Sequence, residues 1–124
     1  MKGSSGAGGI FFTRSAGNAG KLAWYVGATE IITTSSALSL NQWTHIAYVR
    51  TSTSASGANI YINGVSSGTG TDSTNYTNAD STAIGAEYAG TNPMTGYIDD
   101  YRITTGYARY TANFTPPTAA LPTY

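Results

Sequence analysis

The stretch 43-WTHIAYVR-50, followed by 60-IYINGV-65, decides the fold class of this sequence. Both sets of alternating side chains in the first run are largely apolar, which is typical of a strand covered on both faces of its sheet. The second run ends in Asn63-Gly64, the commonest signal for a two-residue type I′ turn. We therefore predict strands over 43–50 and 58–62, and an antiparallel return strand over 65–68.

Similar short runs, separated by turn signals, predict the other elements. They are extended segments over 10–14, 21–26, 30–34, 82–87 and 96–104, and loops over 69–82 and 88–94. In the connector 35–42 we expect Leu38 and Leu40 to enter the core. No stretch keeps the 3.6-residue period over the length of a helix, although 107–110 allows one helical turn. This pattern predicts an all-β antiparallel sandwich.

Length and composition limit how many domains the chain can form and which classes of partner it can bind. The 124 residues suit one domain, with a flexible Gly/Ser leader over 1–9, a sandwich over 10–105 and an extended tail over 106–124. We expect the tail to pack on the sandwich through Phe114 and Leu121. Six basic residues balance six acidic ones, which argues against nucleic acid as a partner, and no apolar run is long enough for membrane insertion. The absence of cysteine excludes disulfides and thiolate metal sites.

Four segments in register carry a family resemblance: 43-WTHIAYVR-50, 60-IYINGV-65, 83-AIG-85 and 96-GYIDDYRI-103. Their order and spacing resemble the laminin G-like domain of the concanavalin A-like lectin/glucanase jelly roll. The tail 106-GYARYTANFTPP-117 is similar to the version of that domain in bacteriophage virion proteins. The resemblance implies that Trp43 packs in the core and that His45 has a structural role on a sheet face.

The resemblance also implies two or more strands before 21–26, whereas here only 9–14 precedes that segment. Three explanations are open: the chain is a fragment, it is a short natural variant, or a neighbouring copy completes the sheet by strand addition. We favour completion by a neighbour. In the family the strand that matches 96–103 pairs with such an N-terminal strand, so without one we expect an open edge rich in Tyr and Ile.

Catalysis is not expected. Glycoside hydrolases of this fold need two carboxylates across the scissile bond, and the glutamates here are only Glu30 and Glu87. Consecutive Asp99 and Asp100 would point to opposite faces of a strand. We predict no cofactor. Calcium is the one candidate, because 72-DSTNYTNAD-80 offers oxygen ligands, but its spacing is not that of an EF-hand, and we predict no metal.

A sugar site would combine an exposed aromatic ring with amide or carboxylate groups. The candidate carbohydrate-binding residues, from two long loops, are Tyr76, Tyr88, Asn92, Asp72 and Asn75, with Tyr25 and Tyr61 as alternatives on strand faces. Half-buried packing in a sheet is the competing interpretation for each tyrosine.

The preferred hypothesis is a non-catalytic, virion-associated structural or decoration module that assembles through exposed strand edges. Its partners would be copies of itself or other virion proteins, and it would lie on a virion surface or outside the cell. The alternative is a lectin-like module that binds cell-surface glycans in a tail fibre or a secreted surface protein, an analogy with the fold rather than a deduction from a site.

Overall fold

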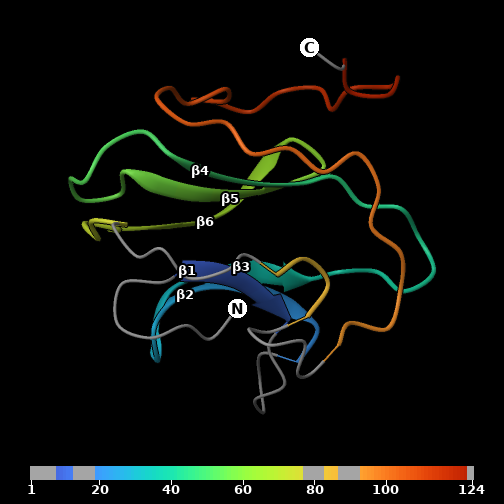
Figure 1. Cartoon of the computed structure of the whole chain (residues 1–124), viewed down its shortest axis with the longest axis horizontal. Coiled ribbons are helices and arrows are strands. Elements are labelled where there is room, and N and C mark those ends of the chain that lie inside the picture. Colours follow the sequence, from blue (N-terminus) through green and yellow to red (C-terminus); the bar gives the residue numbers. More distant parts are fainter. Residues whose placement is uncertain (1–7, 13–18, 77–82, 87–92, 123–124) are drawn as a thin grey trace.

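The structure, a computed structural model, describes residues 8–12, 19–76, 83–86 and 93–122, with the backbone alone for 8–12. Two three-stranded antiparallel sheets stack face to face (Figure 1). One has the order β1-β2-β3 and the other β4-β5-β6. The bounds are β1 Gly8–Phe12, β2 Lys21–Val26, β3 Thr29–Ala37, β4 Ile46–Arg50, β5 Ala58–Ile62 and β6 Val65–Gly70. The predicted all-β antiparallel sandwich is confirmed, and the described ranges contain no helix that could span a membrane.

The hairpin between β5 and β6 forms at the turn that the sequence predicted. Asn63 and Gly64 have φ angles of 50° and 80°, the two positive values that a type I′ turn requires. This geometry matches the twist of the flanking strands, so Ile62 pairs with Val65 directly across the turn.

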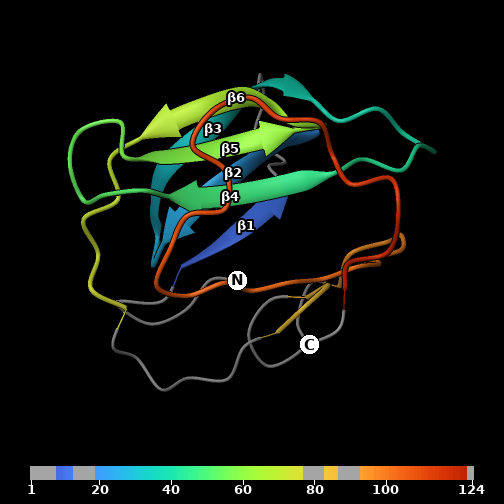
Figure 2. The ribbon, with the colours of Figure 1, turned by 90° about the horizontal axis from the view of Figure 1, so that it is seen from above.

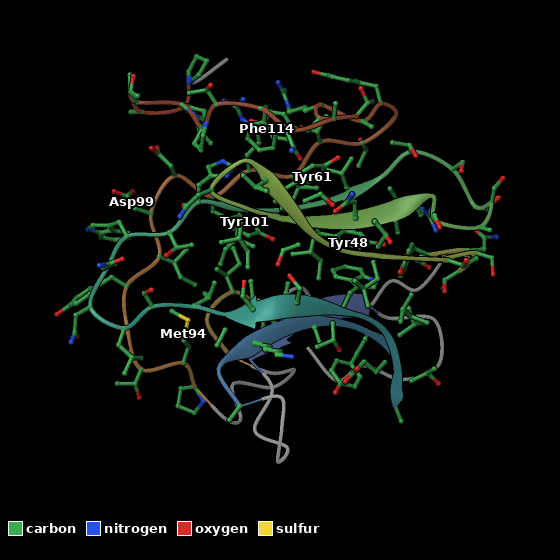
Figure 3. The ribbon with its side chains drawn as sticks, turned by 180° about the vertical axis from the view of Figure 1, so that it is seen from behind. Tyr48, Tyr61, Met94, Asp99, Tyr101 and Phe114 are labelled. Carbon is green, nitrogen blue, oxygen red and sulfur yellow. The ribbon has the colours of Figure 1, made fainter. Side chains whose placement is uncertain are left out.

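The core lies between the two sheets. Its buried members are Leu22 and Ile32 from one sheet, and Ala58 and Ile60 from the other. Strand side chains alternate, so Ile60 faces this core while Tyr61 faces away from it. Figure 3 shows Tyr48 on the inner side of β4-β5-β6, and Tyr61 and Phe114 on its outer side.

The sheets approach most closely where β6 crosses β3. A Cβ atom on Gly68 would lie 2.8 Å from the Thr33 carbonyl oxygen, and one on Gly70 would lie 2.6 Å from the Ile31 carbonyl oxygen. Both distances are too short for a side chain. The two glycines of β6 therefore let its backbone lie directly on that of β3.

The C-terminal residues 110–122, named the strap here, cover the outer face of β4-β5-β6 (Figure 2). The Phe114 ring packs against Tyr61 at a centroid distance of 5.4 Å and against His45 at 5.5 Å, and Tyr110 stacks on Phe114 at 3.6 Å. Tyr61 is consequently only 3 % exposed. Both faces of the sheet β4-β5-β6 are thus covered, as the apolar alternation of 43–50 indicates.

Several predicted elements are wrong. No strand forms over 96–104 or over 83–86, the described part of 82–87, and 107–110 is not helical. Asp100 adopts φ of 50°, which breaks an extended run, and no described strand lies where it could pair with this segment. The strand predicted over 43–50 is shorter at one end, because β4 begins at Ile46. Of the strand predicted over 10–14, β1 contains 10–12, and residues 13 and 14 lie outside the described ranges.

The expected burial of Trp43 and Leu40 is also wrong. Trp43 is 72 % exposed and Leu40 87 % exposed, because the connection from β3 to β4 runs outside the sandwich. Leu38, in contrast, packs against the core as predicted.

Candidate functional site

A buried carboxylate, Asp72, fixes the loop that follows β6. It is 1 % exposed, and its Oδ2 atom accepts hydrogen bonds from the Tyr48 and Tyr76 hydroxyls, both at 2.5 Å. Its Oδ1 atom accepts one from the Thr74 backbone N–H at 3.1 Å and lies 3.7 Å from the Arg50 guanidinium. Arg50 also donates to the Thr74 carbonyl oxygen at 2.6 Å. The loop is therefore bonded to β4 through both its side chains and its backbone.

An aromatic cluster joins this loop to the other sheet. The Trp24 ring of β2 stacks on the Tyr48 ring of β4 with centroids 3.7 Å apart and planes 7° apart. Its Nε1–H donates to the Tyr76 hydroxyl at 3.1 Å. The Arg50 guanidinium lies 4.9 Å from the Tyr76 ring centroid, a cation–π contact. One face of the Tyr76 ring is thereby occupied by a protein group.

These contacts set the charge state of the cluster. Burial alone would raise the pKa of Asp72, but the hydrogen bonds from Tyr48, Tyr76 and Thr74 outweigh it, and the pKa is lowered. Burial, together with the bond to Asp72, raises the pKa of Tyr48 and raises the pKa of Tyr76 to about 12. At neutral pH the cluster holds one carboxylate anion, one guanidinium and two neutral phenols, and it is suited to holding a loop in place.

The predicted sugar-binding residues meet different environments. Asp72 lies beneath the surface, Tyr76 is 38 % exposed with its hydroxyl bonded to Asp72, and Asn75 is exposed beside it. Tyr88 and Asn92 lie outside the described residues.

The two alternative sugar-binding tyrosines on strand faces, Tyr25 and Tyr61, also contact other protein groups. The Tyr25 hydroxyl donates to Glu30 at 2.7 Å, and Tyr61 is covered by the strap. Among the residues that the structure describes, no three acidic or histidine side chains gather closely enough to hold a metal ion.

A small cavity of about 130 Å³ lies where the start of β4 meets the strap. Its lining residues are Thr44, His45, Ile46, Asp99, Asp100, Pro117, Ala119 and Leu121. The prediction that Asp99 and Asp100 point to opposite faces of a strand is wrong, because the turn at Asp100 brings both to this cavity. Each accepts a backbone hydrogen bond: Asp99 from the Asp100 N–H at 2.8 Å, and Asp100 from the Leu121 N–H at 3.3 Å. Burial lowers the pKa of His45.

The end of the sandwich beside this cavity exposes a set of large apolar side chains. We name this set the apolar end; its members are Leu40, Trp43, Tyr97, Ile98, Tyr101, Ile103 and Tyr107, all of them exposed. Two segments supply them, the β3–β4 connection and residues 97–107. The connection and the start of 97–107 lie at the same end of the molecule, and 97–107 then runs along the side of the sandwich toward the opposite end (Figures 1 and 2). Thr44–Ile46 and Asp99–Asp100 line the same cavity, so the two segments are neighbours.

The apolar end adjoins an unpaired strand edge. β4 is the last strand of its sheet, and its outer edge has no strand partner within the ranges described above. Figure 3 shows Met94, Asp99 and Tyr101 toward this end of the sandwich. The sequence predicted an exposed Tyr/Ile-rich segment but not the exposure of Trp43. The sequence around a tryptophan at the start of a strand is the same whether or not another segment covers its side chain.

Comparison of the sequence with known protein families identifies a family with this arrangement of sheets. Residues 1–109 match the family model Laminin_G_3, described as the concanavalin A-like lectin/glucanases superfamily. No curated protein and no solved structure matches the chain. The match spans well over half of the sequence and ends at the strap, and the two antiparallel sheets agree with it. The chain therefore belongs to the concanavalin A-like lectin/glucanases superfamily.

Proposed function

We propose that this protein is a non-catalytic structural module that assembles, through its apolar end, with copies of itself or with other virion proteins. The observation that carries the proposal is the run of five large apolar side chains exposed between Tyr97 and Tyr107. Contiguous exposed apolar surface on a protein of this size is typical of an interaction site. Single exposed residues need no such explanation, but five of them within one short segment do.

The free edge of β4 supports the same proposal. Soluble proteins protect exposed strand edges with charges, prolines or bulges, because an open edge pairs with other chains. β4 is a regular strand of five residues that pairs only with β5 among the described elements. A partner that adds a strand there would also cover the neighbouring apolar side chains.

A place on a virion surface, or otherwise outside the cell, is part of the proposal. It is supported by the resemblance of 106–117 to bacteriophage virion domains and by a composition low in charge and rich in Ser, Thr and Tyr. With six basic and six acidic residues, long-range repulsion between copies is weak, so like molecules can approach closely.

Sedimentation equilibrium over a range of protein concentrations tests the proposal. We expect a mass above that of the monomer that rises with concentration and falls to that of the monomer in the double variant Tyr97→Ser/Ile103→Ser. Val65→Thr is the matched control, because Val65 is also exposed but lies on β6, outside the apolar end. A monomer at every concentration, or an equal effect of the control, would overturn self-assembly.

Carbohydrate binding is the second candidate, and the exposure of Trp43 favours it. An exposed indole flanked by exposed Asn41 and Gln42 offers a flat apolar face with amide groups beside it, the combination that sugar rings require. A glycan array would show reproducible binding that Trp43→Ala abolishes. Loss in Tyr76→Ala or Tyr88→Ala instead would locate the site on the predicted loops, and no binding to any glycan would end this candidate.

A further inference from the structure

We infer that the strap is an acid-released cover: when the side chain of His45 gains a proton, the strap leaves the outer face of β4-β5-β6. The device consists of one titratable ring just before β4, the two aromatic rings of the strap that enclose it, and the sheet face that they cover. It needs only one copy of the chain, so it holds whether or not the protein self-assembles.

The imidazole of His45 is enclosed by the strap. Its ring meets the Phe114 ring edge to face, with centroids 5.5 Å apart and planes at 80°, and it meets the Tyr110 ring at 6.2 Å and 82°. Its Nδ1 atom is sealed from solvent, and no described protein group forms a hydrogen bond with it. A neutral imidazole tolerates this, because its proton can lie on Nε2 and leave a lone pair at Nδ1. An imidazolium has a proton on both nitrogens and would bury an N–H without an acceptor.

The groups that face His45 do not supply that acceptor. Asp99 and Asp100 line the cavity beside it, but within the described residues neither forms an ion pair with the imidazole, and each already accepts a backbone hydrogen bond. The titratable side chain on the strap is Tyr110, and the β5–β6 turn contributes the uncharged Asn63. The faces of aromatic rings attract a cation less strongly than water does, so enclosure disfavours the charged form and lowers the pKa of His45.

The backbone that carries the ring is fixed, so the strap is the part that can yield. The His45 N–H donates to the Asn63 side chain at 2.9 Å, and the His45 carbonyl oxygen accepts from the Asn63 N–H at 2.8 Å. On the strap, the Asn113 side chain accepts from the Ser66 N–H at 2.9 Å, and both residues are exposed. Water can replace that bond at little cost in free energy. Withdrawal of Phe114 then gives the protonated Nδ1 atom access to water.

The direction of the pH dependence follows from the lowered pKa. Above the ordinary value of about 6.5, His45 is neutral whether or not the strap covers it, and the covered form has its full stability. Below that value the uncovered ring binds a proton more readily, so the covered form loses stability until the pH reaches the lowered pKa of the covered ring. Release exposes Tyr61, which is 3 % exposed beneath the strap, and with it an apolar face that is hidden at neutral pH.

NMR at low protein concentration tests the inference, because His45 is the only histidine in the sequence and its ring signals report one group. From pH 7 to pH 5 we expect the protection of the Phe114 amide, its exchange rate relative to an unfolded chain at the same pH, to fall at least about threefold. The Ile60 amide, in the middle strand of the same sheet, should keep its protection. In His45→Phe, which keeps a ring but cannot be protonated, Phe114 protection should change by less than about twofold.

The titration of the imidazole measures the same coupling from the side of the proton. Phe114→Ala opens the ring to water, so the pH of half-protonation should rise toward about 6.5. Thr115→Ala, at the exposed next position, is the matched control and should leave it unchanged. An imidazole that already titrates at its ordinary value in the natural sequence, or an equal loss of Phe114 protection in His45→Phe, would overturn the inference. So would protonation without loss of protection, because the ring would then reach water with the strap in place.

Discussion

At the scale of single residues, Asn63 and Gly64 connect three elements. The Asn63 N–H donates to the His45 carbonyl oxygen at 2.8 Å, and the Asn63 side chain accepts from the His45 N–H at 2.9 Å. Gly64 supplies the carbonyl oxygen that receives the strap at Phe114. The hairpin turn therefore holds the start of β4 and the strap as well as its own two strands. The sequence predicted the turn from local pattern, but the contacts with His45 and Phe114 join residues that are distant in the chain.

Gly64→Ala should destabilise the protein more than Gly27→Ala does. Both glycines have positive φ, but no atom lies within 4 Å of a Cβ at Gly27, while one at Gly64 would meet Phe114. We expect Gly27→Ala to lower the free energy of unfolding by about 1 kcal/mol and Gly64→Ala to lower it by about 1–3 kcal/mol more. Urea denaturation measures both. Equal losses would show that the strap does not press on the turn.

Acid should destabilise the protein through Asp72. Its pKa in the folded state is lowered, so the stabilisation is present above the unfolded value of about 4 and is lost as the pH falls through the folded value. Asp72→Asn should lower the free energy of unfolding at pH 7 by about 1–3 kcal/mol and make its decline in acid shallower. Glu30, whose pKa is also lowered, leaves some acid dependence of stability in both proteins.

Denaturation curves measured from neutral to acid pH provide the check, with Ser73→Ala, at the exposed position next to Asp72, as the control. The control should leave the acid decline unchanged. An acid decline in Asp72→Asn as steep as in the natural sequence would contradict the role assigned to the buried carboxylate.

At the scale of elements, local patterns predicted the strands that pair with their sequence neighbours. β2 and β5 have the predicted bounds, and β6 follows the predicted turn. The prediction failed for 96–104, because a strand there needs a partner from a distant part of the chain, and strand propensity depends strongly on that context. Trp43 was misplaced for a related reason, since its burial depends on whether another segment covers the start of β4.

Where β6 crosses β3, the two backbones lie too close for a side chain at residue 70. We expect Gly70→Ala to lower the free energy of unfolding by about 1–3 kcal/mol, because its Cβ would lie 2.6 Å from the Ile31 carbonyl oxygen. Thr69→Ala, at the exposed position next to it, should change stability by less than about 0.5 kcal/mol. Thermal unfolding of the two variants compares them directly, and a Gly70→Ala protein as stable as its parent would show that the sheets have room to separate.

At the scale of the whole molecule, the sequence predicted the class of fold and the exposed Tyr/Ile-rich segment, but not the site beneath the loop. Asp72, Asn75 and Tyr76 were grouped as ligand-facing residues because they are polar or aromatic and close in sequence. The structure uses Asp72 and the Tyr76 hydroxyl to fasten the loop to Trp24, Tyr48 and Arg50 instead. Composition cannot distinguish a polar group that faces solvent from one that is buried among partners supplied by two sheets.

Hydrogen–deuterium exchange as a function of protein concentration tests most directly whether the apolar end is the surface of contact. Amides in 97–107 and in β4 should exchange more slowly as the concentration rises, while those in the exposed loop 51–56 should keep their rates. The slowing should disappear in Tyr97→Ser/Ile103→Ser. Exchange rates in 97–107 and β4 that do not depend on concentration, in a range where the mass increases, would contradict the account.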